Sequence, residues 1–200
     1  MCFYSQQSKT AQELECRFQA KFKRVELYQP NTYNGFQFPE TPVITNKYDN
    51  IIELYQWGLI PHWAKDDNIK KYTLNARIET IKDKAAFRFS LDNRCLILAD
   101  GFFEWQWLDP KGKQKQKYLI TLPDNDAFAY AGLWSEWKNK KTNEIIKSYT
   151  ILTTEANELM SRIHNTKKRM PVILSKDCEK LWLIGRKFKT QNDQLIATEI

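Results

Sequence analysis

The sequence predicts a single α+β domain that spans residues 1–200. A length of 200 residues is ordinary for one domain, and no internal repeat or low-complexity linker divides the chain. Runs rich in β-branched and aromatic residues alternate with turn-forming segments, as they do in antiparallel sheets. Helix-like segments lie among these runs without the regular alternation of a βαβ fold, which favours the α+β class.

A first helix is predicted to begin at Thr10, because Thr10 and Glu13 have the spacing of a capping box. Leu14, Phe18 and Phe22 then recur every four residues, which predicts one buried helical face. Cys16 falls within this segment, so we expect its side chain to pack in the helix.

Strand-like runs follow the first helix. The expected strands are 51–55, 94–98, 102–107, 118–122, 128–134 and 149–153. Turn-forming residues at 109–112 and 123–126 favour antiparallel hairpins between them. Further helices are expected at 80–87, from Thr154 as N-cap to Ile163, and after Ser175 as N-cap.

The charge balance favours an anionic partner. The 31 Lys and Arg residues exceed the 24 Asp and Glu residues, which gives a formal net charge of +7. Nucleic acid is the commonest partner of a basic domain, whereas a merely soluble, lysine-rich surface is the alternative. The basic residues gather in runs at 111–117, 138–141, 167–169 and 186–189.

The cysteine and histidine content predicts no metal or cofactor. The four cysteines form no CxxC pair and only two histidines are present, so we expect no zinc site. No apolar stretch approaches membrane-spanning length and no secretory signal is visible. The expected compartment is therefore the cytoplasm, where thiols stay free, with nucleoid association when the protein is bound to DNA.

Cys2 is the first residue that suggests chemistry. Removal of Met1 would leave a cysteine that carries a free α-amine beside its thiol, and these groups have ordinary pKa values of about 8 and about 8.5. The amine can condense with an aldehyde to an imine, and the thiolate can close a five-membered thiazolidine ring on the same carbon. A cysteine at position two also occurs as an incidental small residue.

Polar and charged residues in three later segments could support that chemistry. Asn75 and Arg77 are two residues apart, so an extended backbone would point both to one face. Glu104 lies between aromatic residues on an expected strand, where an apolar site would raise its pKa and suit it to acid–base work. Any imidazole role falls to His164 or His62. An exposed strand glutamate and a structural histidine are the alternatives.

Five blocks of the sequence, in order along nearly the whole chain, resemble the signature blocks of the SOS response-associated peptidase (SRAP) family. They are Met1-Cys2, WGLIPHW at 57–63, NARIE at 75–79, GFFEW at 101–105, and His164 with RMPVIL at 169–174. The resemblance implies a compact fold with a twisted, barrel-like mixed sheet flanked by short helices, and a basic groove. It also implies recognition of abasic sites in single-stranded DNA and their covalent attachment to the N-terminal cysteine.

The resemblance assigns a role to each matching residue. Cys2 would be the nucleophile, and Asn75 would orient the amine or the opened sugar. Glu104 and His164 would move protons while the imine forms or reverses. Contacts with DNA would come from Arg77, Arg169, Trp63 and Trp57. The two arginines would bind phosphates, and the tryptophans would stack on bases, although core packing is the alternative for Trp57.

The chain departs from the family pattern in two places. Phe3-Tyr4 follows Met1-Cys2, where the family commonly has Gly-Arg, so a phosphate contact from that arginine is not expected. Four residues separate His164 from Arg169, where the family commonly has one. Either this loop is longer here, or Lys167 and Lys168 share the basic contact.

The leading hypothesis is a monomeric abasic-site sensor that crosslinks single-stranded DNA and removes its own initiator methionine. This hypothesis combines peptidase-type self-processing with lyase-like DNA chemistry. A thiol peptidase that acts on other proteins through Cys2 and His164 is the alternative, and a non-covalent nucleic-acid reader is a third. Only the leading hypothesis needs an amine and a thiol on the same N-terminal residue.

Overall fold

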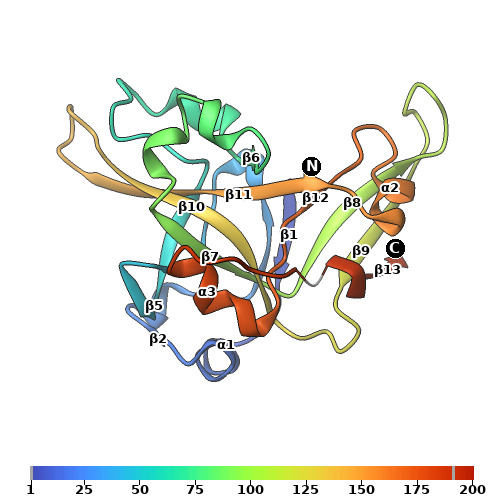
Figure 1. The fold of residues 1–200 in the computed structure, drawn as a ribbon, viewed down its shortest axis with the longest axis horizontal. Coiled ribbons are helices and arrows are strands. Elements are labelled where there is room, and N and C mark those ends of the chain that lie inside the picture. Colours follow the sequence, from blue (N-terminus) through green and yellow to red (C-terminus); the bar gives the residue numbers. More distant parts are fainter. Residues whose placement is uncertain (1, 191) are drawn as a thin grey trace.

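The computed structural model describes residues 2–190 and 192–200, so the predicted removal of Met1 falls outside the described residues. Its centre is a closed, mixed β-barrel (Figure 1). The barrel strands, in order around the ring, are β11 (Ile145–Glu155), β10 (Phe128–Lys138), β7 (Arg94–Ala99), β4 (Glu40–Thr45) and β5 (Tyr48–Trp57). A short parallel pairing of β11 with β5, through Tyr149 and Trp57, closes the ring.

Three short strands extend the barrel sheet. β12 (Arg169–Pro171) and β6 (Asn75–Arg77) both pair with β11, and β2 (Lys21–Phe22) pairs with β5. Through β6 and β12, the NARIE and RMPVIL segments therefore both lie alongside β11.

A second, antiparallel sheet lies beside the barrel. Its strands, in order, are β13 (Ile196–Glu199), β9 (Lys115–Thr121), β8 (Gly101–Trp107), β1 (Tyr4–Gln7) and β3 (Asn31–Asn34). In Figure 1, β1 lies between the barrel on the left and β8 and β9 on the right. One core cluster joins the two parts, because it contains Phe102 of β8 together with Tyr130 and Tyr149 of the barrel.

Helices are few and short. The α-helices are α1 (Ala11–Phe18), α2 (Glu158–Ile163) and α3 (Glu179–Leu183). Single 3₁₀ turns occur at Val25–Leu27, Gly35–Gln37, Asn68–Tyr72, Ile81–Asp83, Arg88–Ser90, Lys176–Cys178 and Asn192–Gln194. Within the described residues, no helix is long and apolar enough to cross a membrane.

The predicted α+β class with a barrel-like mixed sheet is confirmed, as are all the expected strands, most of which are longer than expected. The capping box of α1 is also present, with reciprocal hydrogen bonds between Thr10 and Glu13. The helix ends sooner than the spacing predicted, because Gln19 takes a left-handed conformation (φ 51°) and Phe22 joins β2. Cys16 is exposed rather than packed.

Two later helix predictions were wrong in extent. The helix expected at 80–87 is reduced to a 3₁₀ turn at Ile81–Asp83. The helix expected from Thr154 begins at Glu158 with Asn157 as its N-cap, because Thr154 is paired with Met170 in the sheet. The helix expected after Ser175 is α3, preceded by a 3₁₀ turn.

Candidate active site

Cys2 lies two residues before the start of β1 and is completely buried. Its backbone carbonyl oxygen accepts a hydrogen bond from Asn75 Nδ2 at 2.9 Å, and its thiol donates weakly to the Tyr4 carbonyl oxygen at 3.7 Å. Burial raises the pKa of the Cys2 thiol well above its ordinary value. The thiol therefore needs specific help to react as a thiolate near neutral pH.

Asn75 is held in place by the sheet. It opens β6 and pairs with Ile151 of β11, which fixes the backbone from which the amide reaches Cys2. Its Oδ1 atom is buried and accepts no hydrogen bond from the residues that the structure describes. The side chain thus holds the Cys2 backbone with its donor and keeps an acceptor for another polar group.

Glu104 is the acid–base group expected on β8. Its side chain is buried, and this burial raises the pKa of its carboxyl from 4.5 to about 7. A carboxyl group with a pKa near the working pH can both take up and release a proton, which is what general acid–base catalysis requires.

His164 follows α2 directly as its C-cap residue. Its Nδ1 atom lies 2.8 Å from the carbonyl oxygen of Arg169 and 3.2 Å from the amide nitrogen of the same residue. Burial lowers the pKa of the imidazole to about 4, so the ring is neutral near pH 7. A neutral, oriented imidazole can accept a proton or polarise a water molecule.

Glu104 and His164 line one pocket. Phe3, Trp105, Trp107, Thr166 and Lys167 complete its wall, and its volume is about 160 Å³. Phe3 is the neighbour of Cys2, so the pocket reaches the N-terminal segment. The structure therefore gathers Cys2, Asn75, Glu104 and His164 at the junction of the barrel and the second sheet.

The loop between His164 and Arg169 is held by backbone hydrogen bonds at both of its ends. The Lys168 amide donates to the His164 carbonyl oxygen at 2.9 Å, and the Ala156 amide donates to that of Lys168 at 3.0 Å. Lys168 takes a left-handed conformation at φ 48°, which lets the chain turn back into β12. Lys167 and Lys168 are both exposed on this loop.

Arg169 has a different partner from the phosphate that the sequence suggested. Its guanidinium is buried and forms a two-pronged ion pair with Glu79, at 2.9 and 2.8 Å. One of its nitrogens also donates to the Thr153 carbonyl oxygen at 2.8 Å. These contacts tie β12 to β11 and to the segment that follows β6, so the expected phosphate contact is corrected to a structural ion pair.

Trp57 also belongs to the core. Its ring is fully buried beside Tyr149, and its Nε1 donates to the Leu74 carbonyl oxygen at 2.8 Å. No face of the indole is left for a base, which corrects the expected stacking role. Trp63, by contrast, is 45% exposed, and Arg77 at the end of β6 is exposed.

The structure adds an aromatic surface beside Cys2 that was not predicted. Phe3 and Phe36 have ring centroids 4.7 Å apart, and Phe36 is 55% exposed. Tyr4 packs edge-on against Trp105 at 4.9 Å. The only sequence signal was the departure from Gly-Arg at positions 3 and 4, whose ring partners are distant in the sequence.

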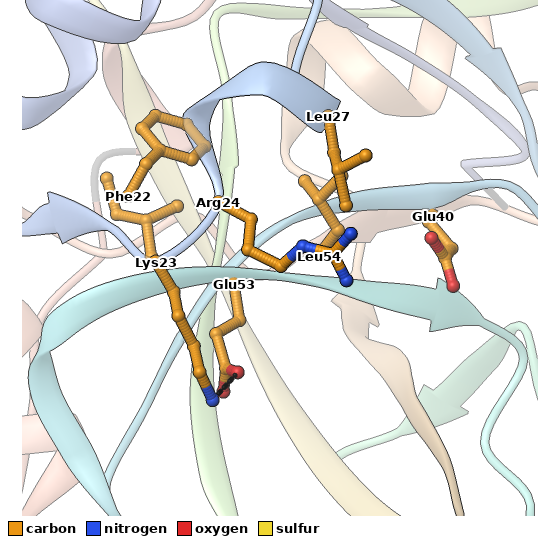
Figure 2. A pocket seen from close by; sticks show the side chains of 8 residues that line it. Phe22, Lys23, Arg24, Leu27, Glu40, Glu53 and Leu54 are labelled. Carbon is orange, nitrogen blue, oxygen red and sulfur yellow. Dashed lines mark hydrogen bonds and ion pairs between the residues drawn. The ribbon is translucent and has the colours of Figure 1, made fainter. Parts of the chain in front are cut away.

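A larger pocket of about 300 Å³ lies on the other part of the barrel, against β2 and β5. Figure 2 shows Phe22 and Leu54 among its lining residues, and the ion pair of Lys23 with Glu53. This ion pair joins the two side chains at 2.8 Å. None of the candidate site residues lines it. The larger volume of this pocket therefore does not identify it as the reaction site.

Comparison with known proteins places this arrangement in a family. The sequence profile of the SOS response associated peptidase (SRAP) family matches residues 1–199. A protein from Bacteroides thetaiotaomicron with an X-ray crystal structure matches with a TM-score of 0.90 and 33% identity, over 100% of this chain and 92% of that one. The chain belongs to the SRAP family.

Named relatives are similar over part of their length. The abasic site processing protein YoqW of Bacillus subtilis is 44% identical over 142 residues, which cover 70% of this chain and 61% of the relative. The abasic site processing protein HMCES of Gallus gallus is 31% identical over 192 residues, which cover 80% of this chain and 55% of the relative. The matched region is thus less than two thirds of either relative.

Proposed function

We propose that this protein processes abasic sites by joining them covalently to Cys2 in single-stranded DNA, after Met1 is removed. The relatives named abasic site processing proteins support the substrate. The observation that carries the chemistry is the gathering of Asn75, Glu104 and His164 at Cys2. The product would shield the lesion.

The reaction has two steps. The α-amine of Cys2 attacks the aldehyde of the opened sugar and gives an imine with loss of one water. The Cys2 sulfur then adds to the imine carbon, the nitrogen takes the proton that the thiol gives up, and a thiazolidine ring results. Asn75 holds the Cys2 backbone for both steps and offers its Oδ1 as an acceptor for the amine.

Glu104 and His164 supply the proton transfers. With a pKa of about 7, Glu104 can take a proton from the amine and return it to the departing water. The neutral imidazole of His164 faces the same pocket and serves as its acid–base partner. Removal of Met1 could use the same groups, because it also requires proton transfer at the Cys2 nitrogen.

Single-stranded DNA would bind through exposed basic and aromatic residues. Arg77, Lys167 and Lys168 would contact phosphates, while Trp63 and Phe36 would stack on bases. Base stacking tolerates any sequence, as recognition of a missing base requires. The protein would act as a monomer in the cytoplasm and associate with the nucleoid when bound to DNA.

A denaturing gel with abasic single-stranded DNA tests the proposal. Wild-type protein should give a shifted, denaturation-resistant band, and Cys2→Ala should not. Cys16→Ala is the matched control, because Cys16 is exposed on α1 and should leave the band unchanged. Persistence of the full, long-lived band in Cys2→Ala would refute attachment through the thiol.

Peptidase action on other proteins is the second candidate. A thiol peptidase with Cys2 and His164 would need a thiolate beside an imidazolium. Burial raises the pKa of the thiol and lowers that of His164 to about 4, which disfavours such an ion pair near neutral pH. Cleavage of a fluorescent peptide library that is lost in Cys2→Ala would favour this candidate instead.

A further inference from the structure

The second sheet turns one face toward the barrel and the other face away from it. Phe102 of β8 and its partner Ile120 of β9 are completely buried in the core cluster that also contains barrel residues. Side chains alternate along a strand, so the intervening positions of β8 point to the opposite face. They are Phe103, Trp105 and Trp107, and none of them belongs to a core cluster of the described residues. In Figure 1, the hairpin of β8 and β9 extends away from the barrel.

Two lysines of β9 lie beside these aromatic rings. Lys117 pairs with Trp105, and its amine lies 4.3 Å from the centroid of the Phe103 ring. Lys115 pairs with Trp107, and its amine lies 5.2 Å from the centroid of that ring. Both tryptophan side chains are partly exposed. These five residues form the outer hairpin face, a row of aromatic rings with ammonium groups beside them.

The positive charge of the outer hairpin face is not neutralised within the protein. No salt bridge among the described residues involves Lys115 or Lys117. Asp109 in the turn of the hairpin accepts hydrogen bonds from backbone amides of the same turn. Lys111 and Lys113 in this turn are exposed and add to the positive charge. The charge of the hairpin is therefore complementary to an anionic partner.

The outer hairpin face begins at the pocket of the candidate site, because Trp105 and Trp107 form part of the pocket wall. Asn165, which follows His164, fixes this junction. Its Nδ2 atom donates to the Trp107 carbonyl oxygen at 2.8 Å, and its Oδ1 atom accepts from the Trp107 amide at 3.2 Å. A strand whose lesion occupies the pocket therefore has its next nucleotides within reach of the outer hairpin face.

We propose that the outer hairpin face binds undamaged nucleotides on one side of the abasic site, with bases on Trp105 and Trp107 and phosphates at Lys115 and Lys117. The choice of partner rests on the proposed function, to which the inference adds a non-covalent binding surface. Aromatic rings with basic side chains beside them hold single strands without regard to sequence.

The spacing of the two tryptophans favours a single strand over a duplex. Side chains two residues apart on a strand are ~7 Å apart, which is twice the ~3.4 Å spacing of stacked bases. Trp105 and Trp107 would therefore each take a base that is splayed out from its neighbour. A duplex keeps its bases stacked and offers no base face to either ring.

Photo-crosslinking tests which rings the bases contact. An undamaged single strand of about 16 nucleotides, long enough to cover such a surface, carries iodouracil, which crosslinks on irradiation to an aromatic ring that stacks on it. Mass spectrometry of the wild-type product should place crosslinks on Trp105 or Trp107. If no crosslink falls on the outer hairpin face, whether or not Trp63 and Phe36 react, the inference is overturned.

The double variant Lys115→Gln with Lys117→Gln tests the phosphate contacts. The slope of log affinity against log salt for the undamaged strand should flatten by about 1.4, or about 0.7 for each of two phosphates. Lys140→Gln with Lys141→Gln is the matched control, because it removes the same charge from the exposed turn between β10 and β11. An unchanged slope, or equal effects of the two double variants, would contradict the inference.

Both measurements use undamaged strands, so neither depends on the chemistry of Cys2. If the hairpin results hold and wild-type protein gives no covalent product with an abasic strand, the proposed function fails and the binding surface stands. If the covalent product forms and the bases do not reach the outer hairpin face, this inference alone is refuted.

Discussion

The side-chain nitrogen of Asn75 lies 2.9 Å from the backbone carbonyl oxygen of Cys2. This single hydrogen bond connects the N-terminal segment to β6, which itself pairs with the barrel strand β11. The nucleophile is thus positioned by the barrel although it precedes the first strand of the other sheet. Asn75 defines where the amine of Cys2 can point.

Asn75→Ala should slow crosslinking of abasic single-stranded DNA about tenfold, the effect expected when a buried carbonyl loses its donor. The physical reason is loss of orientation at Cys2, so affinity for undamaged strands should not change. Single-turnover crosslinking and equilibrium binding measure the two quantities. Asn68→Ala, at an exposed position, is the control, and an Asn75→Ala protein with the wild-type rate would remove the residue from the site.

Glu104 should make the folded protein less stable as the pH rises. Its pKa is about 7 in the folded state and 4.5 as its ordinary value, so the folded state binds more protons between these values. The free energy of unfolding should therefore decrease from pH 4.5 to 7, by on the order of 3 kcal/mol from this group. Urea unfolding of Glu104→Gln should show a shallower decrease, and parallel curves for the two proteins would contradict the raised pKa.

His164 should have the opposite effect at lower pH. Its pKa is about 4 in the folded state and 6.5 as its ordinary value, so the unfolded state binds the extra proton in this window. Stability from this group is fully present above pH 6.5 and is lost as the pH falls towards 4. His164→Gln should unfold less steeply with acid than the wild type, and an NMR titration that places the imidazole pKa above 6 would disprove the assignment.

Arg77→Ala should weaken binding to abasic and undamaged single strands alike, because a phosphate contact reads no base. The slope of log affinity against log salt should flatten by about 0.7, the value for one phosphate on a single strand. Fluorescence anisotropy over a salt series measures it. Arg24→Ala removes an exposed charge from the pocket in Figure 2 and should change neither quantity, so equal effects of the two substitutions would make Arg77 part of the general charge only.

The residue pattern identified Arg77 and Arg169 as candidate DNA contacts but did not show that only Arg77 is exposed. Both arginines belong to recognisable blocks, and nothing local distinguishes them. Arg169 is distinguished by Glu79, which is remote in sequence and reaches it only because β6 and β12 both pair with β11. Cys2, Asn75, Glu104 and His164 were recognisable because each occurs in a block of the family pattern. That these four residues lie close together was implied by the family resemblance and did not follow from the residues themselves.

The fold shows the same division between local and long-range information. Most of the longer strands rich in apolar residues were predicted, although β4 (ETPVIT) was missed. β1 (YSQQ) and β3 (NTYN) were not predicted, because neither contains the apolar run or alternation that indicates a strand. These two strands form only because they pair with each other and β1 pairs with β8. The end of α1 was missed for a related reason, since the four-residue spacing continued to Phe22 after the backbone had turned at Gln19.

The mass of the covalent product tests the central claim most directly. Protein incubated with an abasic single strand should give an adduct equal in mass to the chain without Met1 plus the DNA strand, less one water. Digestion should place the modification on Cys2, because the amine and the thiol both end on the same sugar carbon. An adduct that retains Met1, or one attached to a lysine, would contradict the account.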